Sequence, residues 1–186
     1  NAPAALKDKF VGGTGLACVL MPNTYHHFHS PVDGEILYAE IVEAGSQYSS
    51  GTFGYYDWPN WVPLSGDVGR PGTDFSQFQT NQRGVIIIKV SYANLPGQTP
   101  ERLTGYVASI PVGLETVGSV VFDPTVVKGA KVKKGVTRLG NFFFGGSLNI
   151  MLFSPIEGMD GAHMVDPSVQ TRLGNQIGIL NLPYHP

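Results

Sequence analysis

The sequence has a single cysteine, few charged residues and no long apolar run. Cys18 is alone among 186 residues, which excludes an intrachain disulfide, and its place in the apolar run Leu16–Leu20 predicts a packed side chain rather than a nucleophile. Charged residues make up 14%, below the ~25% of an ordinary globular domain, and with a net charge of −2 no nucleic-acid partner is expected. No apolar stretch approaches the ~20 residues of a membrane-spanning helix.

Other absences bear on where the protein is located and on whether the sequence is the whole protein. Neither an amphipathic basic helix nor a polybasic run is present, so we expect no membrane docking and a cytoplasmic protein. The chain starts at Asn1 without an initiator methionine or a signal-peptide pattern. We therefore expect residues 1–186 to form one unit of a longer protein whose N-terminal part is not in this sequence.

The residues that are present favour a sheet protein. Hydrophobic residues make up 42%, and 24 glycines and 14 prolines supply many turns, whereas no window of a dozen residues has clean helical spacing. Gly34–Val42 alternates, with Ile36 and Tyr38 expected on one face. Further strands are predicted at Val85–Val90, Tyr106–Ile110, Thr116–Phe122, Phe142–Phe144 and Leu148–Phe153. The predicted fold class is mainly β, with antiparallel sheets in a sandwich or barrel-like arrangement and few short helices.

The segment from Gly45 to Asn81 differs from the rest of the chain. It combines glycine, proline and serine with eight aromatic residues, namely Tyr48, Phe53, Tyr55, Tyr56, Trp58, Trp61, Phe75 and Phe78. A loop of this length in a compact domain is usually functional. Two interpretations stay open: a lid or binding loop, and aromatic side chains that pack the loop onto the sheet.

Three of the five histidines fall within four residues, His26, His27 and His29. On a strand, His27 and His29 share one face and His26 takes the other. Imidazoles ligate metals and exchange protons near neutral pH, so a metal site, acid–base chemistry and a solvated strand end are all open at this point. Asp33 is the one adjacent carboxylate, and we expect no metal.

A Gly145-Gly146-Ser147 sequence interrupts two apolar runs. Glycines permit a bulge or tight bend, which is the ordinary interpretation of such a sequence. They also leave the carbonyl of Gly146 unhindered for attack by the hydroxyl of Ser147, and a strained turn would favour that attack. The pattern alone does not decide between a bend and a reactive serine.

The two motifs together resemble one known family. Tyr25–Gly34 resembles the Tyr-His-x-x-His-x-Pro block of phosphatidylserine decarboxylases, and Gly140–Phe153 resembles the self-cleavage strand of that family. Tyr106–Val117 resembles its central strand pair, and the likeness runs in the family's order from Phe10 to Phe153. The resemblance implies a self-processing enzyme in which residues 1–186 hold the catalytic core.

That resemblance carries specific roles. It implies a cut between Gly146 and Ser147, and conversion of Ser147 into a pyruvoyl cofactor that starts a second, cleaved chain. The pyruvoyl group would form a Schiff base with a substrate amine and act as the electron sink for loss of CO2. By analogy His29 is the base for self-cleavage, and His26 serves decarboxylation by positioning or by delivering a proton.

The sequence departs from the family pattern at three places. Gly145-Gly146-Ser147-Leu148 replaces Leu-Gly-Ser-Thr, but keeps the Gly-Ser pair. Asp8 does not match the upstream aspartate that orients the catalytic histidine, and Asp33 is a weak substitute that fits a turn before Gly34 better. The aromatic insertion between residues 45 and 81 is long for a membrane phospholipid decarboxylase.

The insertion and the Gly-Gly-Ser variant resemble a soluble fungal branch of the family. That branch includes an L-tryptophan decarboxylase that makes tryptamine in psilocybin biosynthesis, so we expect a small amino-acid substrate, tryptophan first. Tyr55, Tyr56, Trp58 and Trp61 are candidates for stacking on an indole. A phosphatidylserine decarboxylase that makes phosphatidylethanolamine, a non-catalytic β-rich binding domain and a zinc hydrolase stay open as alternatives.

Overall fold

The computed structural model describes residues 2–21, 23–43, 81–94, 96–113, 119–143, 147–156, 162–164 and 171–180. A four-residue helix α1 (Ala4–Lys7) and a 3-10 turn η1 (Asp8–Phe10) precede the strands. The strands are β1 (Thr14–Leu20), β2 (His27–His29), β3 (Gly34–Val42), β4 (Arg83–Ala93), β5 (Arg102–Gly113), β6 (Ser119–Phe122), β7 (Lys131–Val132), β8 (Arg138–Phe143), β9 (Ser147–Phe153), β10 (Ala162–Met164) and β11 (Gly178–Leu180). The predicted β-rich fold with antiparallel sheets and little helix is confirmed.

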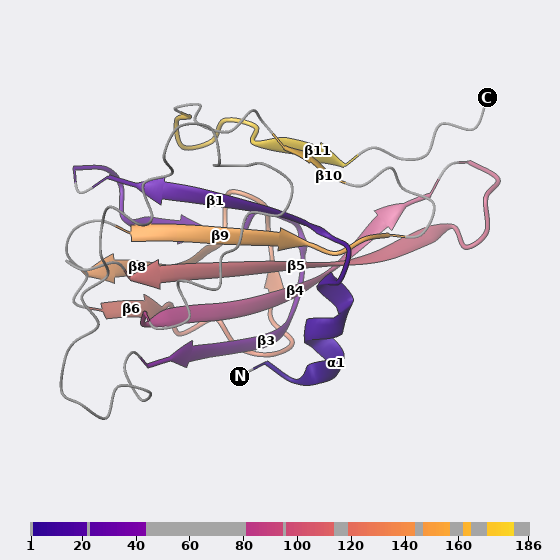
Figure 1. The fold of residues 1–186 in the computed structure, drawn as a ribbon. Coiled ribbons are helices and arrows are strands. Elements are labelled where there is room, and N and C mark those ends of the chain that lie inside the picture. The colour runs from indigo at the N-terminus through magenta and orange to yellow at the C-terminus, as the bar shows by residue number, and fades with distance from the viewer. Residues whose placement is uncertain are drawn as a thin grey trace.

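The strands form three antiparallel sheets. The large sheet has six strands in the order β1-β9-β5-β4-β3-β7, and Figure 1 shows the first five of them lying side by side in this order. A second sheet has the order β2-β8-β6, and β10 pairs with β11 in a third. Because β9 lies between β1 and β5, this late strand is an interior strand of the large sheet.

The main core lies between the large sheet and the β2-β8-β6 sheet. Its buried side chains come from both, for example Ile86 and Ile88 of β4, Met151 of β9, and Phe28 and Phe142 of the smaller sheet. The β-branched run in β4 supplies this face because alternate residues of a strand point the same way.

The outer face of the large sheet is covered near the N-terminus. Ala2, Leu6 and Phe10 pack against a cluster that includes Ile87 and Ala108. Figure 1 shows α1 beside β3 and β4. None of the described helices is long and apolar enough to cross a bilayer.

One predicted strand alternates differently from expectation. Gly34–Val42 is a strand as predicted, but its register against β4 shifts between Ile36 and Tyr38. This bulge puts Ile36 in the main core and Tyr38 on the opposite, outer face. The expectation that both side chains share a face is therefore wrong, because one inserted residue inverts the alternation.

Candidate active site

The chain crosses from one sheet to the other immediately before Ser147. Strand β8 pairs with β2 and β6 in the small sheet, whereas β9 pairs with β1 and β5 in the large sheet. Residues 144–146 join the two strands and lie outside the described residues, so the predicted cut at Gly146 falls at this crossing. The segment resembling the self-cleavage strand therefore supplies strands to both layers.

Ser147 opens β9 at a position closed to solvent. The residue is 0% exposed, and its neighbours in the sheet are Leu20 on β1 and Gly113 on β5. Its Oγ lies 3.1 Å from Nδ1 of His26, a residue 121 positions earlier in the chain. A serine hydroxyl hydrogen-bonded to an imidazole and shielded from water has the arrangement of an activated nucleophile.

His26 is held in place through Phe142 of β8. The backbone N–H of Phe142 donates to the carbonyl of His26 at 2.9 Å. The His26 ring meets the Phe142 ring edge-on, with centroids 6.5 Å apart and planes at 84°. In the tautomer that carries its hydrogen on Nε2, Nδ1 of His26 accepts the proton of the serine hydroxyl.

The other two histidines lie under the ring of Tyr25. Its ring centroid is 4.8 Å from that of His27 and 5.9 Å from that of His29. The Tyr25 hydroxyl is 2.9 Å from Nε2 of His29, in a hydrogen bond at the protein surface. Within the described part of the chain, Nδ1 of His27 and Nδ1 of His29 are inaccessible to solvent and have no hydrogen-bond partner.

Strand alternation explains this division of the three histidines. Phe28 points into the main core, so His27 and His29 share the opposite face, as the sequence predicts. His26 takes the inward side, where Ser147 also points. The structure thus brings His26 and Ser147 together, whereas His29 contacts Tyr25 and not Ser147.

Two side chains weighed from the sequence have structural roles. Asp33 lies in the bend that precedes β3, as predicted, and its Oδ1 accepts a hydrogen bond from the backbone N–H of Lys134 at 2.7 Å. Cys18 packs against the main core as predicted, and burial raises the pKa of its thiol. A thiol with a raised pKa is a poor nucleophile at neutral pH.

A buried polar pair close to Ser147 was not predicted. The hydroxyl of Ser109 on β5 donates to Oδ1 of Asn149 on β9 at 3.1 Å. Asn149 lies two residues after Ser147 and so shares its face of the strand. The signal was visible in the sequence as one amide side chain inside the apolar run from Leu148 to Phe153.

Several predicted features lie outside the described residues. Tyr55, Tyr56, Trp58 and Trp61 fall in the segment 44–80, and Gly146 falls in 144–146. The zinc alternative finds no support, because the described ranges contain no group of three His, Cys, Asp or Glu side chains that could hold a metal ion.

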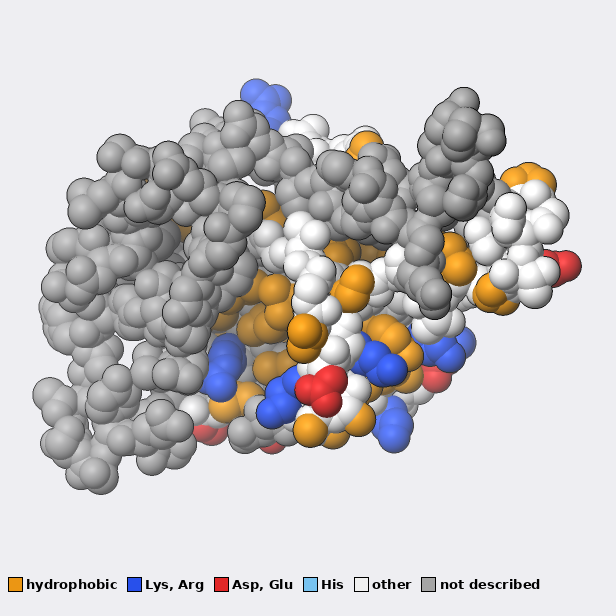
Figure 2. Space-filling model, turned by 45° about the vertical axis from the view of Figure 1, so that its right-hand side comes forward, with side chains coloured by type: hydrophobic (Ala, Val, Ile, Leu, Met, Phe, Trp, Pro, Cys, Tyr) orange, Lys and Arg blue, Asp and Glu red, His pale blue; other side chains and the backbone are white. Residues whose placement is uncertain are grey.

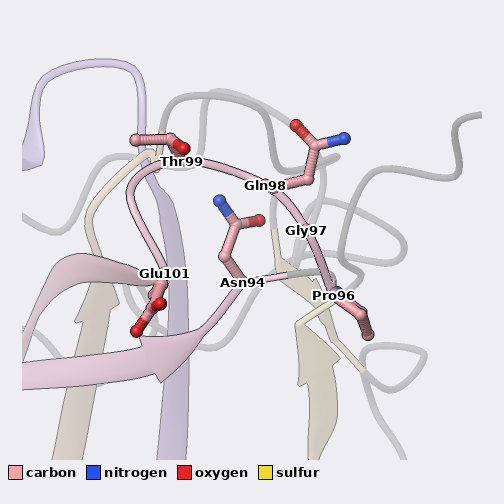
Figure 3. Close-up of a pocket in the computed structure, with 6 residues that line it drawn as sticks. All are labelled: Asn94, Pro96, Gly97, Gln98, Thr99 and Glu101. Carbon is pink, nitrogen blue, oxygen red and sulfur yellow. The ribbon is translucent and has the colours of Figure 1, made fainter.

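Two surface hollows lie away from Ser147. One is formed by the turn between β4 and β5, where the amide of Asn94 donates to the carbonyl of Pro100 at 2.8 Å and lies between the arms of the loop (Figure 3). The other is lined by residues such as Glu35, Lys89 and Lys131. On the face shown in Figure 2, basic side chains lie beside acidic and apolar ones, so no charge of one sign dominates there.

Comparison with known proteins identifies the family of this chain. The family model described as phosphatidylserine decarboxylase matches residues 1–179. A decarboxylase named iboD from Amanita muscaria is 32% identical over 164 residues, which cover 83% of this chain and 41% of the relative. A phosphatidylserine decarboxylase proenzyme from Fusobacterium nucleatum is 33% identical over 148 residues, covering 80% of this chain and 39% of the relative.

A phosphatidylserine decarboxylase proenzyme from Chlamydia trachomatis is 29% identical over 178 residues, covering 93% of this chain and 49% of the relative. The chain thus spans less than half the length of these curated relatives. No solved structure matches the chain. The family match over residues 1–179, together with relatives at 32% and 33% identity, shows that this chain belongs to the phosphatidylserine decarboxylase family.

Proposed function

We propose that this chain is the catalytic core of a cytoplasmic, pyruvoyl-dependent decarboxylase that cuts itself between Gly146 and Ser147 and removes CO2 from an amino acid. The observation that carries the proposal is the 3.1 Å contact between Nδ1 of His26 and the fully buried Oγ of Ser147. The contact joins the two motifs on which the family resemblance depends.

Self-cleavage uses only groups of the chain and one water. Oγ of Ser147 loses its proton to an imidazole and attacks the carbonyl carbon of Gly146. The C–O bond forms as the peptide C–N bond breaks, which leaves an ester and a free amine on residue 147. Loss of the α-proton of residue 147 then expels the Gly146 carboxylate and leaves a dehydroalanine. One water converts this residue into a ketone and releases ammonia.

The surroundings of Ser147 fit the pyruvoyl group that this sequence of steps produces. The residue begins an interior strand, is paired on both sides, and is closed to solvent, so its strand position can be held when the bond to Gly146 breaks. A pyruvoyl group there supplies an electrophilic carbonyl and an electron sink for decarboxylation. Exclusion of water from this buried position protects such a carbonyl from side reactions.

Two histidines are candidates for the base of self-cleavage. The family resemblance assigns this role to His29 and assigns proton delivery during decarboxylation to His26. The hydrogen bond of His26 to Ser147 supports a proton-transfer role of His26 at residue 147. The same bond favours His26 as the base as well, because His29 is paired with Tyr25.

For the substrate we propose a soluble aromatic amino acid, with L-tryptophan and its product tryptamine as the first pair to test. The proposal is supported by the likeness of the Gly-Gly-Ser sequence and of the aromatic insertion to the fungal branch. It is consistent with the Amanita muscaria relative, whose name states only a decarboxylase. In this proposal Tyr55, Tyr56, Trp58 and Trp61 stack on the substrate ring.

Phosphatidylserine is the second candidate substrate. The observation in its favour is that the bacterial relatives are named phosphatidylserine decarboxylase proenzymes. Both candidates carry an α-amino acid group, so the chemistry proposed at residue 147 is the same for either. The two differ in what is attached to that group, an indole or a diacylglycerol phosphate.

The test is the intact mass of the denatured protein beside that of a Ser147→Ala variant. We expect two species from the wild type, one ending at Gly146 and one beginning with a blocked residue 147, and a single uncut species from the variant. Tryptophan and phosphatidylserine assays then identify the substrate. One uncut wild-type species with the mass of the variant plus one oxygen would contradict the proposal and favour a non-catalytic binding domain.

A further inference from the structure

Asn149 is a polar side chain at a position where the strand pattern calls for an apolar one. It lies on the face of β9 that also carries Ser147, Met151 and Phe153, and the last two belong to the main core. Only 9% of its surface is exposed. Burying an amide costs stability unless its polar atoms have partners, so this residue needs a reason to be there.

Ser109 supplies a hydrogen-bond partner for the oxygen of the Asn149 amide. This serine is fully buried on β5, and its hydroxyl donates to Oδ1 of Asn149 at 3.1 Å. The bond assigns the two ends of the amide, because the serine hydrogen needs an acceptor and Oδ1 supplies it. In a planar amide the N–H2 end then lies on the side away from Ser109.

The N–H2 end is open. In the part of the chain that the structure describes, Nδ2 of Asn149 makes no hydrogen bond. It is not among the unpartnered atoms that are fully closed to solvent, which are Nδ1 of His27 and Nδ1 of His29. Nδ2 therefore keeps some accessible surface in a residue that is otherwise buried. The register neighbours of Asn149 are Cys18 on β1 and Pro111 on β5. Neither carries a charge that would repel an anion, since burial raises the pKa of the Cys18 thiol.

We propose that the side-chain amide of Asn149, held by Ser109, binds the carboxylate of the amino-acid substrate. This inference rests on the proposed function and extends it to the part of the substrate that every candidate shares. Two residues along a strand span about 7 Å, which separates the Asn149 backbone from the reacting position at residue 147. Four bonds lead from the reacting carbon of residue 147 through the substrate nitrogen to a carboxylate oxygen, and a charged hydrogen bond adds about 2.8 Å, so together they are long enough to bridge this gap.

The chemistry of the open end selects the ligand. With Oδ1 occupied by Ser109, the amide presents donors only, and a carboxylate is the acceptor common to tryptophan and to the serine headgroup. Holding that group by an uncharged donor fixes its orientation. A lysine or arginine would bind the anion more strongly and would oppose the loss of its charge as CO2. Asn149 is thus a substrate-orienting residue at the site.

The experiment compares Asn149→Asp with wild type in the full chain. Aspartate has nearly the same shape, and its carboxylate still accepts the Ser109 hydrogen bond, but it offers no donor and carries a negative charge. Asn141→Asp is the matched control, because Asn141 lies on β8 opposite His27, on the outward side of the small sheet. Asn149→Leu removes the donor without adding charge.

Two calorimetric titrations of each self-cleaved protein separate the roles. One uses the 1-aminophosphonate analogue of the substrate amino acid, which keeps an anion in place of the carboxylate and cannot lose CO2. The other uses the product amine, which has no anion. We expect the Kd of the aminophosphonate to rise roughly tenfold to hundredfold in Asn149→Asp, the cost of one charge-assisted hydrogen bond. The Kd of the amine should stay at its wild-type value, as should both constants in Asn141→Asp.

Each other result has a defined meaning. An unchanged Kd for the aminophosphonate, or equal losses for aminophosphonate and amine, overturns the inference while the proposed function stands. If Asn149→Asp does not cut itself, Asn149→Leu takes its place in both titrations. Failure of both variants to cut themselves would show that Asn149 serves the fold, which also overturns the inference. An uncut wild-type chain overturns the proposed function and the inference with it.

Discussion

Replacing His26 with alanine tests the central contact of the site. In the structure, Nδ1 of His26 is hydrogen-bonded to Oγ of Ser147, and no other imidazole of the described residues is. The serine is fully buried, so bulk water cannot take its proton instead. From this geometry we expect His26→Ala to block self-cleavage, and His29→Ala to leave it intact.

The expected magnitude follows from the role of the imidazole. A positioned general base contributes roughly a hundredfold to ten-thousandfold to a rate, so self-cleavage should slow by that factor in His26→Ala. The accompanying loss of stability is small, since one hydrogen bond contributes about 1 kcal/mol against a total of roughly 5–15 kcal/mol for a domain. The variant should therefore remain folded and uncut.

The assay is a time course of cleavage after synthesis, followed by intact mass and by gel, with circular dichroism as the check on folding. His27→Ala is the matched control, because it also removes an imidazole and lies between the two candidates in the sequence. This variant should cut itself at the wild-type rate. Wild-type cleavage in His26→Ala together with an uncut His29→Ala would refute the reasoning. The family assignment of His29 as the base would then hold, and Ser147 would need a different neighbour in the reacting conformation.

Three further changes test other parts of the structure. Tyr25→Phe removes the hydrogen bond to His29 at the surface and should lower the free energy of unfolding by less than about 1 kcal/mol, measured by urea denaturation, with cleavage unaffected. Gly140→Ala places a Cβ against the Val121 carbonyl and 2.6 Å from Cζ of Phe28, and should cost about 1–3 kcal/mol in the same assay. Burial raises the pKa of Tyr92 from 10.0 to about 12, so the unfolded chain binds fewer protons between these values and the melting temperature should fall as pH rises from 10 to 12.

Each of these predictions has its own contrary result. A large loss of cleavage in Tyr25→Phe would mean that the Tyr25–His29 pair takes part in the chemistry. Wild-type stability in Gly140→Ala would mean that the strands of the small sheet can move apart locally without cost. For the alkaline transition, Tyr92→Phe is the control and should flatten the decline. An identical decline in that variant would assign it to another group.

The strands were predictable from sequence because their residues are locally informative. The β-branched run from Val85 to Val90 and the apolar run from Leu148 to Phe153 both lie in strands of the large sheet. Local sequence patterns do not reveal where a strand carries an extra residue relative to its partner, which is why the bulge after Ile36 was not predicted. They also do not report pairing order, and so did not reveal that β9 lies between β1 and β5.

The site was predictable in its members but not in its pairings. The histidine block and the Gly-Ser pair could be found because both resemble family motifs. Which histidine meets Ser147 depends on the direction in which each side chain leaves the segment 26–29, and Ser147 lies 121 residues after His26. The pair of Ser109 and Asn149 likewise depends on the register between β5 and β9. Such contacts are set by tertiary structure.

The interior position of β9 has a consequence for the products of self-cleavage. A cut before Ser147 would leave the second chain hydrogen-bonded along both edges, to β1 and to β5 of the first chain. The two pieces would then be an obligate heterodimer, since separating them would open the middle of a sheet and expose its core. Folding of the uncut chain is unimolecular, whereas refolding of the cut pieces would be bimolecular. After denaturation, recovery of the cut protein should therefore depend on its concentration, so maturation would make the fold far harder to rebuild than it was to form.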